Sequence, residues 1–283
     1  MENTGRNCEM IRRIRYTGPE DTEERNRTTM ENTQNLLLDF SHVYPEGVEK
    51  RAKNLKRIDM SDISGTDMYC SKEAEQKIRK RLKPYGPQGI HFPDNGNYHY
   101  MTKFFTEKIG EPFSLVLFDH HNDMQQPLIH ELTGCGSWAG ELLRENSRLK
   151  QMILIGPDPE SIRPVPARLR EKIICISVEE SEEHTAEAEI KKINLKLPAY
   201  ISVDKDVLNR YNARTNWNQG NMSVTTLKKL LREVFRHQKV IGVDICGECS
   251  LQEPFPEFLE DERINDVTNQ ILYHFLSERR FLA

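Results

Sequence analysis

The 283-residue chain has no long apolar segment and no excess of positive charge. Without a run of about 18 or more apolar residues, no transmembrane helix is predicted. The stretch from Met1 to Tyr16 is polar and contains arginine, and it lacks the apolar core of a secretory signal peptide, so we expect a cytoplasmic protein. With 40 basic and 44 acidic residues the formal net charge is −4, which gives no overall positive field to attract nucleic acid or an anionic membrane.

Cysteine is sparse, and repeats and low-complexity tracts are absent. Six cysteines scattered through a long chain indicate free thiols rather than a disulfide framework. Cys246 and Cys249 form a C-x-x-C motif, but no second pair completes a zinc site, so a redox or zinc role is the less favoured interpretation. The content of 37% hydrophobic and 30% charged residues is typical of a globular protein with a core.

The distribution of apolar residues predicts the architecture. Residues 1–34 show no sustained apolar period and are expected to form a mobile N-terminal arm. Residues 35–283 are expected to form a single domain in which short apolar runs alternate with amphipathic stretches. The runs predict strands buried on both faces, as in a parallel sheet, at residues 36–38, 115–118, 152–155, 173–176, 200–203 and 240–243. Helical spacing occurs at residues 72–83, 138–146, 223–237 and 264–281. This alternation predicts an α/β fold, a three-layer α/β/α arrangement with a mostly parallel sheet.

Two of the predicted strands end in polar motifs rich in metal-ligand residues. The run 115–118 is followed by Asp119-His120-His121-Asn122-Asp123, and the run 200–203 by Asp204-Lys205-Asp206. The carboxyl ends of strands in such sheets are where ligands gather. Because alternate side chains of an extended backbone share a side, Asp119, His121 and Asp123 are expected to converge, and Asp204 to lie beside Asp206.

The donor types indicate a pair of divalent cations. Clustered carboxylates in a partly dry cleft cannot all stay ionised without positive charge nearby. Carboxylate and imidazole without thiolate suit Mn²⁺ best, although Fe, Co, Ni and Zn also fit. His99, in the turn-like segment 94–99, adds a further ligand. The alternative is that these residues only cap turns, as Asp and Asn after a strand often do, but the two motifs together favour metal.

These motifs resemble those of the arginase/agmatinase (ureohydrolase) family. Residues 119–123 match its D-A-H-x-D signature, residues 202–206 match S-x-D-x-D, and residues 95–99 stand where the family has a Gly-Gly-Asp-His turn. The resemblance runs from about residue 36 to residue 281. It implies an arginase/deacetylase-like fold and a single catalytic domain at 35–283.

The resemblance also implies a binuclear manganese centre that hydrolyses a C–N bond of a guanidino compound. Two Mn²⁺ ions per chain and a hydroxide held between them would provide the nucleophile. The implied ligands are His99 and Asp123 for one ion, His121 and Asp206 for the other, and Asp119 and Asp204 as bridges.

Three departures from the family pattern concern the substrate. Ser137 replaces the histidine that shuttles protons to the leaving amine, so His130 or a metal-bound water would have to substitute. The guanidinium-binding glutamate is displaced by one residue, to Glu248, the best candidate for a bidentate contact. Lys205 lies between two ligand aspartates, so its side chain is expected to point away from the metals and to need a buried partner. Trp217 is expected either to form a pocket wall or to cap the core.

Several functions stay open at this point. The favoured partner is a small-molecule or peptide guanidino substrate, such as an arginine side chain within a peptide. Free arginine is disfavoured, because residues 124–127 and 135–136 differ from the arginase residues that hold its α-carboxyl and α-amino groups. The alternatives are a deacetylase-like amide hydrolase and a metal-binding protein that has lost turnover. No nucleic-acid or membrane partner is expected, and a homo-oligomer is left open.

Overall fold

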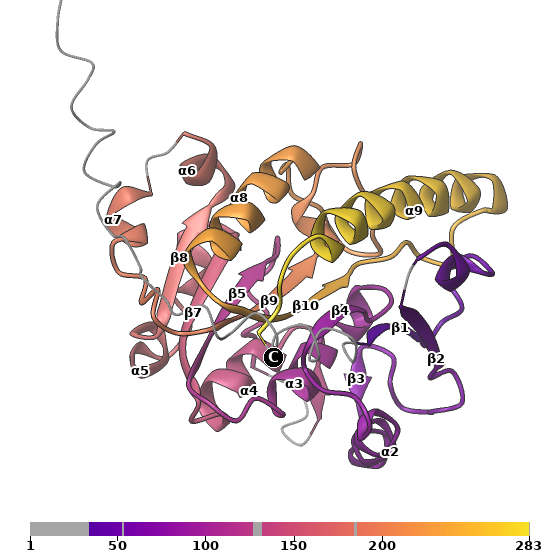
Figure 1. The fold of residues 1–283 in the computed structure, drawn as a ribbon, viewed down its shortest axis with the longest axis horizontal. Helices are drawn as coiled ribbons and strands as arrows, with labels where there is room; N and C mark the ends of the chain where they lie inside the picture. Colours follow the sequence, from indigo (N-terminus) through magenta and orange to yellow (C-terminus); the bar gives the residue numbers. More distant parts are fainter. Residues whose placement is uncertain (1–33, 53, 127–131, 184–185, 283) are drawn as a thin grey trace, which may run out of the picture. The chain divides into compact units, whose positions relative to one another are not determined.

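The computed structural model describes residues 34–52, 54–126, 132–183 and 186–282. Their centre is an eight-stranded sheet in which every paired strand runs parallel to its neighbour (Figure 1). The order across the sheet is β2-β1-β4-β10-β9-β5-β7-β8. The strand bounds are β1 Asn35–Asp39, β2 Leu55–Asp59, β4 Gly89–Phe92, β5 Phe113–Phe118, β7 Leu149–Gly156, β8 Ile173–Ser177, β9 Ala199–Asp204 and β10 Val240–Cys246. A separate antiparallel pair joins β3 Tyr69–Cys70 to β6 Thr133–Gly134.

Helices cover both faces of the sheet. In Figure 1, α8 and α9 lie on one face, while α2, α3 and α4 lie on the other. The α-helices are α2 Lys72–Leu82, α3 Met101–Thr106, α4 Trp138–Glu145, α5 Ala167–Arg170, α6 Val178–Glu182, α7 Glu187–Ile190, α8 Val224–His237 and α9 Phe255–Ser277. The 3₁₀ turns are η2 Val48–Arg51, η3 Gly96–Tyr98, η4 Pro159–Ile162 and η5 Lys205–Val207.

Two apolar layers flank the sheet, and adjacent residues of one strand enter different layers. Leu115 and Leu117 of β5 pack with α3 and α4, whereas Val116 of the same strand packs in the layer that includes residues of α8 and α9. Such alternation is what a strand buried on both faces requires. The predicted three-layer α/β/α architecture is therefore confirmed.

The sequence prediction missed parts of this framework. The central strand β4 is only four residues long and carries the polar His91, so it gives no apolar run. The edge strand β2 has exposed residues and gives none either. Helix α9 begins at Phe255, nine residues before the predicted start at Ile264. The early start was missed because the first turns of the helix, which begin with Pro254 and Pro256, are exposed and acidic.

Three further predictions concern the N-terminal arm, membrane-spanning helices and disulfides. Of the predicted arm, residues 1–34, only Gln34 lies within the described residues. Among the described residues, no helix combines the length and the apolar character needed to span a bilayer. The five described cysteines are free thiols.

His91 gives the fold a dependence on pH. Its ring is fully buried, stacks on Phe105 at a centroid distance of 3.9 Å and lies 3.3 Å from the Tyr200 hydroxyl. Burial lowers the pKa of His91 to about 3. The unfolded chain therefore binds a proton that the folded chain does not bind. The contribution of neutral His91 to the free energy of unfolding is fully present above the unfolded pKa of about 6.5 and is lost as the pH falls.

We expect this single histidine to cost about 1.3 kcal/mol of stability between about pH 7.5 and about pH 5.5. Urea unfolding of the wild type and of His91→Gln at both pH values measures the effect. The variant should lose about 1.3 kcal/mol less than the wild type over this interval, whatever its stability at neutral pH. Equal losses in both proteins would show that His91 is not the responsible group.

Candidate metal centre

The predicted ligands meet at the carboxyl end of the sheet, where β5 and β9 are neighbours. Asp119 follows β5 directly, and Asp204 is the last residue of β9. His99 follows η3, in the connection that leaves β4. The parallel sheet places all these strand ends on one edge, so residues far apart in the sequence converge there.

One half of the cluster centres on His99. Its Nδ1 atom lies 3.0 Å from Asp123 Oδ2, 3.3 Å from Asp119 Oδ2 and 3.4 Å from Asp204 Oδ2. The side chain of His99 is only 1% exposed. His99, Asp119 and Asp123 form a group whose ligand atoms all lie within 4.8 Å of one another, a separation that one cation can bridge.

The other half centres on His121 and uses Asp119 again. His121 Nδ1 lies 2.8 Å from Asp206 Oδ2 and 3.7 Å from Asp119 Oδ1. These three residues form a second group of the same compactness. Asp119 thus faces both halves with different oxygens, as a carboxylate between two ions would.

Backbone geometry brings the ligands together, although not through the strand alternation expected from the sequence. After β5 the chain bends at His120 and His121, and Asp123 has a positive φ of 50°. Asp119, His121 and Asp123 converge as predicted, while Asn122 turns away and donates to the Ser161 carbonyl.

Neighbouring groups fix the carboxylates of the cluster. Trp138 Nε1 donates to Asp123 Oδ2 at 2.6 Å. Asp206 accepts from the His120 backbone N–H at 2.9 Å, and Asp204 accepts from that of Asp206 at 2.9 Å. Asp123, Asp204 and Asp206 are therefore each oriented by an N–H donor, as expected of a preorganised metal site.

A relay of polar side chains sets the tautomer of His99. Its Nε2 atom lies 2.9 Å from Ser202 Oγ, and that hydroxyl donates to Asp244 Oδ1 at 2.6 Å. Because the hydroxyl hydrogen goes to Asp244, Ser202 accepts from Nε2–H. The Nδ1 lone pair then points at the three carboxylates, the arrangement found in histidine metal ligands.

Removing this relay should weaken metal binding. We expect Ser202→Ala to lower the affinity for divalent metal by about 10- to 100-fold, because His99 loses the acceptor that orients its ring. Isothermal titration of the metal-free protein measures the change. Ser114→Ala is the matched control, since Ser114 is also buried but contacts Gln151 at the other end of β5. An unchanged affinity in Ser202→Ala would contradict the tautomer assignment.

The electrostatics of the cluster indicate missing positive charge. Burial, then the charge of Asp206, raises the pKa of Asp204 to about 7. Burial, then the charge of Asp119, raises the pKa of Asp206 to about 6. Hydrogen bonds to Asp119 and Asp206 raise the pKa of His121 to about 11. Protons therefore supply the charge in the metal-free chain, and divalent cations would displace them.

The residues present fit divalent metal ions. Asp119 Oδ2 is buried without a hydrogen-bond partner although it lies beside His99 and near Asp204. A buried carboxylate oxygen without a hydrogen-bond partner is unfavourable unless a cation lies beside it. The donors are carboxylate oxygens and imidazole nitrogens, which suit manganese and related ions.

The cluster has a closed side and an open side. His99 is buried, whereas the side chain of His121 is 34% exposed. Trp217 lies beside His121 with 6.3 Å between the ring centroids, and its Nε1 donates to Asn97 Oδ1. Trp217 is itself 38% exposed, so it borders the open side rather than capping the core.

Glu248, which was predicted to bind a guanidinium, is buried and engaged by two other side chains. Glu248 Oε1 accepts from Lys205 Nζ at 2.6 Å and from Asn269 Nδ2 at 2.8 Å. Both side chains of the Lys205–Glu248 pair are nearly inaccessible, at 0% and 4% exposure. Lys205 thus points away from the cluster and has the buried partner that the sequence analysis required.

The backbone before Glu248 leaves no room for a side chain. Gly247 has a φ of 93°. A Cβ atom there would lie 2.5 Å from Asp204 Oδ1 and 2.8 Å from the Lys205 nitrogen. Only glycine fits at position 247, so a carboxylate cannot take this position without a change in the backbone.

The two other predicted catalytic residues are not in the described cluster. Ser137 is buried in a network away from the ligands, where its hydroxyl donates to Glu141 Oε1 at 2.8 Å. Glu141 also accepts from Lys103 Nζ at 2.9 Å. His130 lies outside the described residues. The residue after Ser137 is the one that reaches the cluster, through the indole of Trp138.

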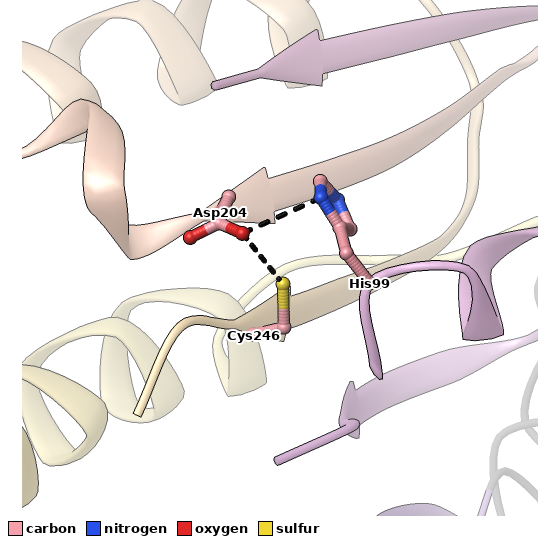
Figure 2. A group of neighbouring side chains, drawn as sticks. All are labelled: His99, Asp204 and Cys246. Carbon is pink, nitrogen blue, oxygen red and sulfur yellow. Dashed lines mark hydrogen bonds and ion pairs between the residues drawn. The ribbon is translucent and has the colours of Figure 1, made fainter. Parts of the chain in front are cut away.

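Cys246 is a site residue that the sequence analysis did not place. It is the last residue of β10 and is paired in register with Asp204 of β9. Its Sγ lies 3.2 Å from Asp204 Oδ2, as Figure 2 shows. The sequence signal for Cys246 was its C-x-x-C motif with Cys249, which did not indicate contact with Asp204, because the pairing of β9 with β10 is not visible in the sequence.

Comparison with solved structures identifies the fold. Proclavaminate amidino hydrolase from Streptomyces clavuligerus superposes with a TM-score of 0.62 and 15% identity over 86% of this chain and 92% of that one. Trypanosoma cruzi formiminoglutamase with Mn²⁺ gives 0.58 and 15% over 87% and 93%. Formimidoylglutamase from Bacillus subtilis gives 0.57 and 16% over 86% and 87%. The chain has the ureohydrolase fold, which confirms the fold expected from the motifs.

Sequence comparison defines the family more narrowly. No family model matches the chain. A Thermotoga maritima protein described as uncharacterized is 30% identical over 230 residues, which cover 81% of this chain and 85% of that protein. The chain belongs to the same family as this Thermotoga protein.

Proposed function

We propose that the chain is a hydrolase that binds two divalent metal ions and cleaves a C–N bond of a guanidino or amidino compound. The observation that carries the proposal is that Asp119 belongs to two groups of candidate ligands, one around His99 and one around His121. The fold shared with an amidino hydrolase and with formiminoglutamases supports the reaction class.

Five of the proposed ligands belong to the two groups, and Asp204, 3.4 Å from His99 Nδ1, is the sixth. His99 and Asp123 would hold one ion, and His121 and Asp206 the other, with Asp119 and Asp204 between them. Two such ions lower the pKa of bound water and stabilise negative charge that develops on the reacting group. Mn²⁺ suits the oxygen and imidazole donors, and it is the ion named for the T. cruzi formiminoglutamase structure.

The chain's own residues would orient these ligands and admit the substrate. Trp138 fixes Asp123, and Ser202 with Asp244 retains the proton on His99 Nε2. The substrate would approach from the exposed side of His121, where Trp217 offers an aromatic wall. A planar guanidino or amidino group, free or on a peptide, can stack on such a ring.

A second candidate function is hydrolysis of an acylated amine by the same centre. The engagement of Glu248 by Lys205 favours it, because an amide substrate needs no carboxylate to bind a guanidinium. The two functions share the metal ligands but release different products.

Metal stoichiometry tests the shared part of the proposal. The protein dialysed against saturating Mn²⁺ should retain about two ions per chain, because one ion cannot satisfy both ligand groups. Elemental analysis with a protein concentration from amino-acid analysis gives the number. A plateau near one ion would contradict the binuclear centre.

The reaction is tested on the Mn²⁺-loaded protein with two parallel screens. One follows release of urea or ammonia from guanidino and formimino compounds, including peptides that contain arginine. The other follows acetate release from acetylated amines. Turnover in the first screen that is lost in Asp119→Asn supports the leading proposal, whereas turnover in the second screen alone supports the amide hydrolase. Absence of turnover in both, with two ions bound, would leave a metal-binding protein without hydrolase activity.

A further inference from the structure

We propose that Cys246 is a metal ligand and that it gives the His99 side of the centre a preference for thiophilic cations over Mn²⁺. This inference rests on the proposed binuclear centre and adds a residue and a metal selectivity to it. It starts from the third group of candidate ligands, His99, Asp204 and Cys246, whose ligand atoms all lie within 4.8 Å of one another.

The sheet places the thiol inside the centre. Cys246 and Asp204 are register partners on adjacent parallel strands, so their side chains project from the same face. Cys246 Sγ is 3.2 Å from Asp204 Oδ2, and that oxygen is 3.4 Å from His99 Nδ1. In Figure 2 the three side chains point toward one another from three different segments.

Ordinary core packing does not account for this thiol. Buried cysteines usually act as small apolar side chains among other apolar groups. Cys246 is fully buried, yet it faces a carboxylate and an imidazole. The same His99 nitrogen also lies 3.3 Å from Asp119 Oδ2, a buried carboxylate oxygen without a hydrogen-bond partner. His99 therefore belongs both to the group with Cys246 and Asp204 and to the group with Asp119 and Asp123.

The donor types on the two sides then differ. The His99 side offers a sulfur donor, which favours Zn²⁺, Co²⁺ or Fe²⁺ over Mn²⁺. The His121 side offers carboxylates and imidazole alone in its candidate group, Asp119, His121 and Asp206. When a cation binds to the first side, the S–H bond of Cys246 breaks, its electron pair forms the bond to the metal, and the proton leaves to water.

Cobalt provides a test that does not depend on turnover. The protein loaded with Co²⁺ should show a thiolate-to-cobalt charge-transfer band in the near ultraviolet. The band should disappear in Cys246→Ser and persist in Cys135→Ser and Cys249→Ser. Cys135→Ser is the control for a half-buried thiol, and Cys249→Ser is the control for a buried thiol three residues after Cys246. In competition titrations, Cys246→Ser should lose about tenfold or more in Zn²⁺ affinity and less than about threefold in Mn²⁺ affinity.

The outcomes separate this inference from the proposed function. Two bound Co²⁺ ions without a charge-transfer band in the wild type, or a band that persists in Cys246→Ser, overturn the role of Cys246 while the binuclear centre stands. Failure to bind any metal overturns both. The wild-type spectrum and the two control variants decide the question even where Cys246→Ser folds poorly.

Discussion

Replacement of Asp119 by asparagine is expected to weaken the binding of both metal ions, whereas Asp123→Asn should weaken only one. Asp119 faces His99 with one oxygen and His121 with the other, while Asp123 contacts only the His99 side. An amide has one weaker oxygen donor and no charge, so it cannot serve two cations. Retained metal should fall from about two ions per chain to below about one in Asp119→Asn, and to about one in Asp123→Asn.

Elemental analysis after dialysis against a low concentration of Mn²⁺ distinguishes the two variants. Asp62→Asn serves as a control, since Asp62 is exposed and pairs with Arg81 rather than with a candidate ligand. Equal metal loss in Asp119→Asn and Asp123→Asn would contradict the position of Asp119 between the two ions.

The second large effect concerns stability. Lys205→Met should destabilise the metal-free protein by about 3–5 kcal/mol, because Glu248 is left as an uncompensated buried charge. In a chain of this size the loss corresponds to a melting temperature lower by roughly 5–10 °C. Because stability is measured without metal, a change in metal affinity cannot contribute to the difference between the variant and the wild type.

Two further variants make this result specific. Lys192→Met removes the partner of Glu189 in an ion pair that is 60% and 31% exposed, and should change stability by less than about 0.5 kcal/mol. Lys205→Met combined with Glu248→Leu should recover part of the loss, because an apolar pair replaces a buried ionic one. A double variant less stable than Lys205→Met alone would contradict the assignment.

The candidate ligands Asp119 and Asp204 could be predicted because each follows an apolar run, at residues 115–118 and 200–203. The parallel sheet brings the carboxyl ends of these strands to one edge. The three-layer fold followed from the same runs. The expected cause of the convergence, alternation of side chains along an extended strand, was wrong. Bends in the backbone and the positive φ of Asp123 bring His121 and Asp123 inward instead.

What the sequence did not reveal depends on pairings between distant strands. Cys246 enters the centre only because β10 lies beside β9 in this register. The partner of Glu248 likewise depends on the left-handed turn at Gly247, which directs the next side chain toward Lys205 and Asn269. Neither the strand order nor the sign of one dihedral angle can be read from residue spacing.

Gly247 also limits which substitutions this turn tolerates. Introducing a glutamate at position 247 would drive its Cβ into Asp204, and would leave Lys205 paired with Glu248 on the other side. A carboxylate added at this position would therefore disturb a candidate metal ligand before it could contact a substrate. The backbone of the turn has to change first, so the exchange of one side chain alone cannot place a carboxylate here.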